Sequence, residues 1–167
     1  QRQMCIRDSY DARASLMWTA TMSLNGLTNV GNQNGWTVHP IEHELSAYYD
    51  ITHGVGLGIM TPRWMKHVLS DKTLPRFAQF GRHVWELTGT DKEVAHLAIQ
   101  KTFDWIKSLE VPTTLPEVGI IDGTYFQDMA ESAVMVGHLN HAAYVTLQVA
   151  DVVHLFEEAM TDHDFSK

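Results

Sequence analysis

Residues 39–58 read His-Pro-Ile-Glu-His-Glu-Leu-Ser-Ala-Tyr-Tyr-Asp-Ile-Thr-His-Gly-Val-Gly-Leu-Gly, a stretch that holds three histidines. His39 and His43 are four residues apart, so on a helix they lie on one face. A tight turn after Tyr49 would fold the following helix back and bring His53 to the same point. Neutral imidazole nitrogens that converge in this way are typical of a metal site.

The glycines that follow the third histidine, Gly54, Gly56 and Gly58, raise the question of a phosphate-binding loop. A dinucleotide-binding loop should follow a strand, and the sequence before these glycines predicts none. We therefore expect the glycines to allow two helix backbones to pack closely. Pro62 is expected to kink or end this helix, because proline removes a backbone donor and its ring crowds the preceding turn.

The rest of the chain also shows helical signals. A helix is expected from Asp11 to Asn25-Gly26, and Thr90 with Glu93 forms a capping box before an amphipathic helix that reaches Leu109. Further helices are expected near 124–136 and 149–160, with a short turn at 114–119. No strand-like alternation is present, so the predicted fold class is all-α. We expect a foreign or disordered tail at 1–9, one helical metal-binding domain over 10–160 and a C-terminal tail at 161–167.

Composition narrows the classes of function. The 167 residues are 44% hydrophobic and carry a formal net charge of −8. A chain this acidic, without a basic cluster, is not expected to bind nucleic acid. No apolar run reaches the roughly 18 residues of a membrane span. A single cysteine, Cys5, excludes an intrachain disulfide and fits a reducing, cytoplasmic location.

Two readings of the histidines come from the residues alone. His39-x-x-Glu42-His43 matches the inverted zinc-protease motif, in which both histidines bind zinc and the glutamate activates water. That chemistry needs a third ligand from a downstream acid, for which Glu110 and Glu117 are the candidates. The other reading is a non-enzymatic helical interaction module whose histidines belong to the core.

Three separated stretches, residues 17–26, 35–54 and 109–120, together resemble the iron-containing alcohol dehydrogenases. The likeness is to their butanol-dehydrogenase-like branch. It covers residues 11–136 and continues more loosely to about 160. The resemblance implies a two-domain, dehydroquinate-synthase-like fold. In that fold an N-terminal α/β domain, absent from this chain, binds NAD or NADP, and a C-terminal helical domain binds a divalent metal.

The resemblance also implies roles for the histidines. The family's metal is bound by one aspartate and three histidines, and two of these fall on His39 and His53. His43 falls on a residue that is not a ligand but lies near the nicotinamide and the substrate, so it becomes the catalytic and cofactor-binding candidate. Glu42 is then expected at the helix surface or beside the metal ligands. Fe²⁺ is the expected ion, with Zn²⁺ as the alternative.

The chain departs from the family pattern in its metal ligands, as well as in lacking the glycine-rich loop and the cofactor-binding domain. The missing ligands should be an aspartate and a histidine four residues apart on an earlier helix, and no histidine precedes His39. The chain is therefore expected to be a C-terminal fragment, cut inside the metal site, that binds metal weakly and is inactive alone. The parent enzyme is expected to be a homodimer that oxidises small alcohols or reduces aldehydes.

Overall fold

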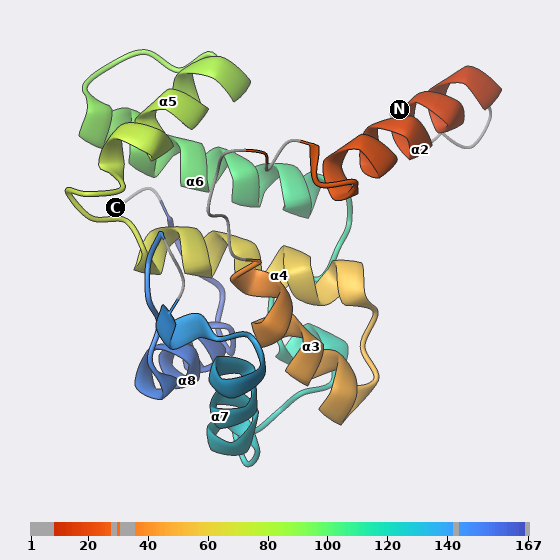
Figure 1. The fold of residues 1–167 in the computed structure, drawn as a ribbon, viewed down its shortest axis with the longest axis vertical. Coiled ribbons are helices and arrows are strands. Elements are labelled where there is room, and N and C mark those ends of the chain that lie inside the picture. The colour runs from red at the N-terminus through yellow and green to blue at the C-terminus, as the bar shows by residue number, and fades with distance from the viewer. Residues whose placement is uncertain (1–8, 28–29, 31–35, 142–143, 166–167) are drawn as a thin grey trace. The chain divides into compact units, whose positions relative to one another are not determined.

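The computed structural model describes residues 9–27, 30, 36–141 and 144–165. Every regular element among these residues is a helix (Figure 1). The prediction of an all-α chain is therefore confirmed for the described residues. None of the described helices combines the length and apolar character needed to cross a membrane.

The chain divides into two compact units, Gln1–Asn34 and Gly35–Lys167. The first unit contains α2, which spans Tyr10–Leu24. The hydroxyl of Ser9 caps this helix by accepting a hydrogen bond from the Ala12 N–H at 3.2 Å. The helix gives way to Asn25 and to Gly26, whose φ of 82° suits glycine. The helix expected from Asp11 to Asn25-Gly26 is thus confirmed.

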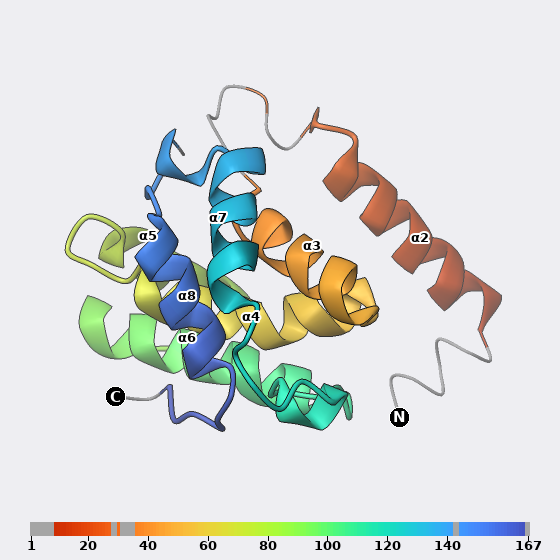
Figure 2. The same ribbon diagram turned by 90° about the horizontal axis from the view of Figure 1, so that it is seen from below.

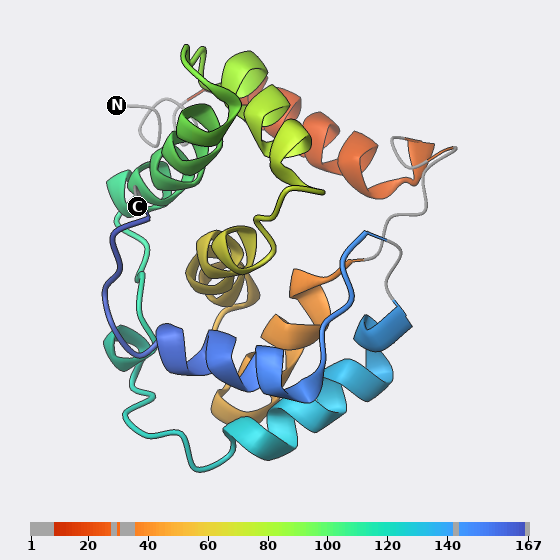
Figure 3. The same ribbon diagram turned by 90° about the vertical axis from the view of Figure 1, so that its left-hand side faces the viewer.

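The second unit holds the remaining elements: α3 (Val38–Tyr49), α4 (His53–His67), α5 (Leu74–Val84), α6 (Asp91–Ser108), η2 (Pro116–Val118), α7 (Phe126–Val136), η3 (Leu139–His141) and α8 (Val149–Glu158). Helix α4 lies in the middle of this unit and packs against α3, α6 and α8 (Figures 1 and 3). Helix α7 packs between α3 and α8 (Figure 2). The central position of α4 holds its first residue, His53, against α3.

Apolar side chains at helical spacing hold α3 and α4 together. Ile41 and Leu45 of α3 and Ile59 and Met60 of α4 have no exposed surface. Burying a side chain of this size stabilises a fold by about 1.5–3 kcal/mol. The stretch that carries the three histidines therefore also supplies much of the core around them.

Arg63 of α4 is fully buried and joins three parts of the second unit. Its guanidinium donates to the carbonyl oxygens of Thr113, Glu158 and Thr161 at 2.9, 3.0 and 2.8 Å. A fourth hydrogen bond goes to the Ile59 carbonyl within α4 at 2.7 Å. Burial lowers the pKa of Arg63 to about 10. Arg63 thus stays charged near neutral pH and fixes the segment after α6 and the end of α8 on α4.

Two expectations about the elements were wrong or incomplete. Pro62 does not end its helix, because α4 continues to His67. Helix α5 was not predicted, although Pro75 stands in its first turn and Phe77, Ala78 and Gly81 form its buried face. A methyl group on Gly81 would meet Val94 of α6 at 2.6 Å, so α5 packs closely against the next helix along the chain. That contact is not visible in local periodicity.

The segment expected to be a C-terminal tail contributes to the core. Phe165 has no exposed surface, and its backbone N–H donates to the Gln100 side chain at 2.7 Å. The Phe165 ring also lies 4.9 Å from the ring of Phe103, between centroids. The domain limits of 10–160 stay a prediction.

Candidate metal centre

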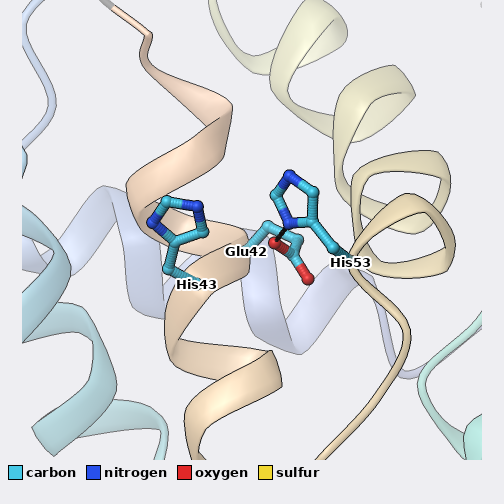
Figure 4. A group of neighbouring side chains, drawn as sticks. All are labelled: Glu42, His43 and His53. Carbon is cyan, nitrogen blue, oxygen red and sulfur yellow. Dashed lines mark hydrogen bonds and ion pairs between the residues drawn. The ribbon is translucent and has the colours of Figure 1, made fainter.

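The turn between α3 and α4 brings the three histidines together. Asp50 ends α3 with a left-handed φ of 52°, a conformation that reverses the chain within a few residues. Helix α4 begins at His53, while His39 and His43 lie four residues apart on one face of α3. Figure 4 shows the side chains of His43 and His53. Ring centroids are 5.3 Å apart for His39 and His53, 5.2 Å for His43 and His53, and 6.1 Å for His39 and His43. The spacing of the sequence thus produces a cluster of imidazoles.

Glu42 lies beneath this cluster and is fully buried. The Ser46 hydroxyl, one turn along α3, donates to its Oε1 at 2.6 Å. Its other oxygen, Oε2, pairs with Nδ1 of His53, as the dashed line in Figure 4 marks. The alternative that placed Glu42 at the helix surface is therefore wrong. The sequence pattern did not predict the contact between Glu42 and His53, because it forms only when α4 folds back on α3.

Gly56 makes room for the buried carboxylate. A methyl group at this position would lie 2.6 Å from both Cγ and Oε1 of Glu42. The neighbour is thus a side chain, and the expectation of backbone-to-backbone packing was wrong at Gly56. Gly54 has nothing within 4 Å of such a methyl group, and Gly58 would make only ordinary contacts with Ile106 and Val111 at 3.4 and 3.5 Å. The glycine run lies inside a helix, and no strand precedes it in the described part of the chain.

The environment of His39 favours its neutral form. Partial burial lowers the pKa of His39, and the nearby His53 and His43 lower it further, while the charge of Glu42 acts in the opposite direction. Trp36 covers one side of the ring, edge to face, with 4.4 Å between ring centroids. An imidazole must be unprotonated to bind a metal ion, so this environment prepares His39 for that role.

The cluster fits a divalent metal ion. Two imidazoles that bind one ion through nitrogens about 2.1 Å away have ring centroids roughly 5 Å apart. The pairs that include His53 match this separation. Among the described residues, the group of potential ligands that lies together is Glu42, His43 and His53, with ligand atoms within 4.8 Å of one another. Ring spacing does not separate His39 from His43 as a ligand, so their division of roles stays a prediction.

Glu110 and Glu117, the acids proposed as the third zinc ligand of a protease, do not lie in the histidine cluster. Glu117 accepts hydrogen bonds from the backbone N–H groups of Thr113 and Thr114 at 2.6 and 3.0 Å. Neither it nor Glu110 belongs to the metal-ligand group found among the described residues. Glu42, the supposed base of that mechanism, has both oxygens engaged by Ser46 and His53. The arrangement does not favour peptide hydrolysis.

Comparison with known proteins gives consistent relatives. Residues 2–160 match the C-terminal model of the Fe-containing alcohol dehydrogenase family. The NADH-dependent butanol dehydrogenase A of Clostridium acetobutylicum is 43% identical over 157 residues, which is 91% of this chain and 39% of the relative. The NADPH-dependent aldehyde reductase YqhD of Escherichia coli is 36% identical over 119 residues, covering 70% of this chain and 30% of that protein. The chain spans about two fifths of the length of the butanol dehydrogenase.

Solved structures agree with these relatives. The NADH-dependent butanol dehydrogenase A of Thermotoga maritima superposes with a TM-score of 0.83 at 32% identity, covering 95% of this chain and 42% of that one. The substrate- and cofactor-free aldehyde reductase YqhD of E. coli gives 0.81 at 28% identity, covering 92% of this chain and 40% of that one.

Proposed function

The chain belongs to the Fe-containing alcohol dehydrogenase family, and on that premise we propose that it forms the metal-binding part of an NAD(P)-linked alcohol dehydrogenase or aldehyde reductase. The observation that carries the proposal is the convergence of His39, His43 and His53 at the start of α4. The substrate would be a small alcohol or aldehyde. NAD or NADP would bind chiefly to residues outside this chain, since its glycine run is helical.

Each histidine has a distinct part in this proposal. His39 and His53 supply two nitrogen ligands to a divalent ion. An ion held there would polarise the substrate oxygen as a Lewis acid and favour the alkoxide during hydride transfer. His43 lies 5.2 Å from His53 between ring centroids, so it faces the same space and can orient the substrate or move a proton.

The nature of the ligands leaves the metal open between two ions. Imidazole nitrogen and carboxylate oxygen suit Fe²⁺ and Zn²⁺ alike. The description of the family names iron, and we therefore propose Fe²⁺ as the resident ion, with Zn²⁺ as a substitute.

A hybrid enzyme tests the proposal. The region of this chain that matches the Clostridium butanol dehydrogenase would replace that region in the relative, and NADH oxidation with butanal would be followed. His53→Ala should lose metal and turnover together. His43→Ala should keep the metal but lose rate by about a hundredfold or more, as expected for a positioned proton-transfer group. His83→Ala, an exposed histidine on α5, is the control and should change neither. Full metal content in both His53→Ala and His43→Ala would refute the ligand assignment.

The isolated chain provides the complementary experiment. Two imidazoles leave most of the coordination shell of a divalent ion to water, so we expect weak metal binding. With Fe²⁺ or Zn²⁺, NADPH and a short aldehyde, the isolated chain should show no dehydrogenase activity. Robust turnover would contradict the proposal that residues outside this chain complete the site.

A further inference from the structure

We infer that Glu42 is a positioning residue: its buried carboxylate fixes His53 in the tautomer and orientation that present Nε2, not Nδ1, to the metal. This inference rests on the proposed metal site and deepens it. It assigns a function to a carboxylate that the protease motif made a base and that the resemblance left without a role. It also explains why a glycine stands at position 56.

Both oxygens of the Glu42 carboxylate have a partner. Glu42 has no exposed surface, and a buried carboxylate is stable only when its oxygens accept hydrogen bonds. The Ser46 hydroxyl occupies Oε1, so the partner of Oε2 is His53 Nδ1. The proton must then lie on His53 Nδ1. A neutral imidazole carries one N–H, so Nε2 is left with its lone pair.

The pairing of Nδ1 with Glu42 leaves Nε2 of His53 available to a metal. The hydrogen bond made by one ring nitrogen decides which nitrogen is free to bind a metal. A carboxylate behind a ligating histidine also holds the ring in place and raises its basicity. The His53 side chain is 46% exposed, so the protein around its outer edge constrains it little. Glu42 is the hydrogen-bond partner shown for this ring among the described residues, and it fixes the direction of Nδ1.

Residues of α3 and α4 enclose this carboxylate. Gly56 lies one turn after His53 on α4, at the point where a methyl group would meet Cγ and Oε1 of Glu42 at 2.6 Å. Ser46 lies one turn after Glu42 on α3 and also comes within 3.1 Å of the Ile51 carbonyl oxygen in the connecting turn. Both helices and the turn thus hold the carboxylate under His53.

A competing arrangement makes Glu42 itself a ligand, together with His43 and His53. An ion between Glu42 and His53 would have to bind both Oε2 and Nδ1 at about 2.0–2.2 Å from each. In this structure those two atoms pair with each other, so Nε2 is the nitrogen of His53 that is left for an ion. The geometry therefore favours a carboxylate–histidine–metal order.

Imidazole ¹⁵N NMR on the full 167-residue chain tests the inference without any assay of activity. In the wild type we expect His53 to carry its proton on Nδ1. Glu42→Leu removes the acceptor and should lose this preference, whereas Glu42→Gln keeps an amide oxygen and should retain most of it. Glu44→Gln is the matched control, because Glu44 lies two residues on and accepts from Ser132 of α7 at 2.7 Å. It should leave the His53 spectrum unchanged.

Addition of Zn²⁺ to the same samples completes the test. The metal-induced shift should appear on Nε2 of His53, and Glu42→Leu should weaken Zn²⁺ binding by about tenfold to a hundredfold. Glu42→Gln should weaken it less. A wild-type His53 protonated on Nε2, or a zinc shift on Nδ1, would overturn the inference in favour of Glu42 as a direct ligand. If neither His39 nor His53 shifted with Zn²⁺ although the tautomer was as expected, the proposed metal site would fail, and not the positioning of His53.

Discussion

The carboxylate of Glu42 is buried and pairs with Ser46 and His53. Gly56, which has no side chain, leaves the space that this carboxylate occupies. Of the three glycines at 54, 56 and 58, only Gly56 would bring an added methyl group as close as 2.6 Å to a neighbour, Glu42. The interactions with Ser46 and His53 keep Glu42 in this position. The spacing of the histidines could be read from sequence, but the burial of Glu42 could not. It depends on His53 and Gly56, which lie eleven and fourteen positions further along the chain and reach Glu42 only because α4 folds back on α3.

Alanine substitutions at two glycines of α4 test this steric account. Gly56→Ala should destabilise the chain by about 1–3 kcal/mol, the usual range for overpacking. Gly58→Ala makes only ordinary contacts at 3.4 and 3.5 Å, so it is the control. It should be neutral or stabilising by up to about 1 kcal/mol, because alanine favours a helix over glycine. Denaturant unfolding of both variants measures the difference, and equal effects of the two substitutions would contradict the account.

At the scale of elements, the sequence predicted a helix correctly where residues close in sequence stabilise it. Thr90 accepts from the Glu93 N–H at 3.4 Å and Glu93 accepts from the Thr90 N–H at 2.9 Å, so the predicted capping box is confirmed. Helix α4 continues past Pro62, so the expectation that proline ends it was wrong, and the local pattern did not predict α5. Gly81 lowers the helix propensity of α5, but its lack of a side chain allows close contact with Val94 of α6.

The turn that contains η2 has a pH-dependent stability. Hydrogen bonds from the backbone N–H groups of Thr113 and Thr114 lower the pKa of Glu117 from its usual 4.5. Because the folded pKa is below the unfolded one, this carboxylate stabilises the fold above the unfolded pKa. The contribution is lost as the pH falls through the folded value.

Glu117→Gln tests this dependence. The difference in unfolding free energy between the wild type and this variant should be largest above about pH 4.5 and should shrink as the pH falls. Thermal unfolding over a series of pH values measures it. A difference that grew on acidification would reverse the sign and contradict the assignment of these hydrogen bonds.

At the scale of the whole second unit, one buried guanidinium connects segments that are far apart in sequence. Arg63 reaches Thr113, Glu158 and Thr161, and none of these pairings follows from a local pattern. The all-α class, most helix positions and the histidine cluster could be predicted from spacing and capping. The packing that places α4 at the centre could not, because it depends on such long-range contacts.

Arg63→Met tests the importance of this connection. Methionine fills part of the volume but leaves several buried carbonyl oxygens without donors, at about 1–3 kcal/mol for each unsatisfied group. We expect a loss of about 3 kcal/mol or more in unfolding free energy, or a chain that does not fold. Arg76→Met is the control, because Arg76 is exposed and its guanidinium donates to the Gln79 side chain at 3.1 Å. It should change stability by less than about 0.5 kcal/mol. Similar losses in both variants would contradict the central position of Arg63.

The central claim is that His39 and His53 are ligands of one divalent ion, and a Zn²⁺ titration of the chain and its variants tests it most directly. Calorimetry should show one weak site in the wild type, binding weakened by about tenfold or more in His39→Ala and His53→Ala, and wild-type binding in His83→Ala. Wild-type binding in His39→Ala and His53→Ala, or an equal loss in all three variants, would contradict the claim.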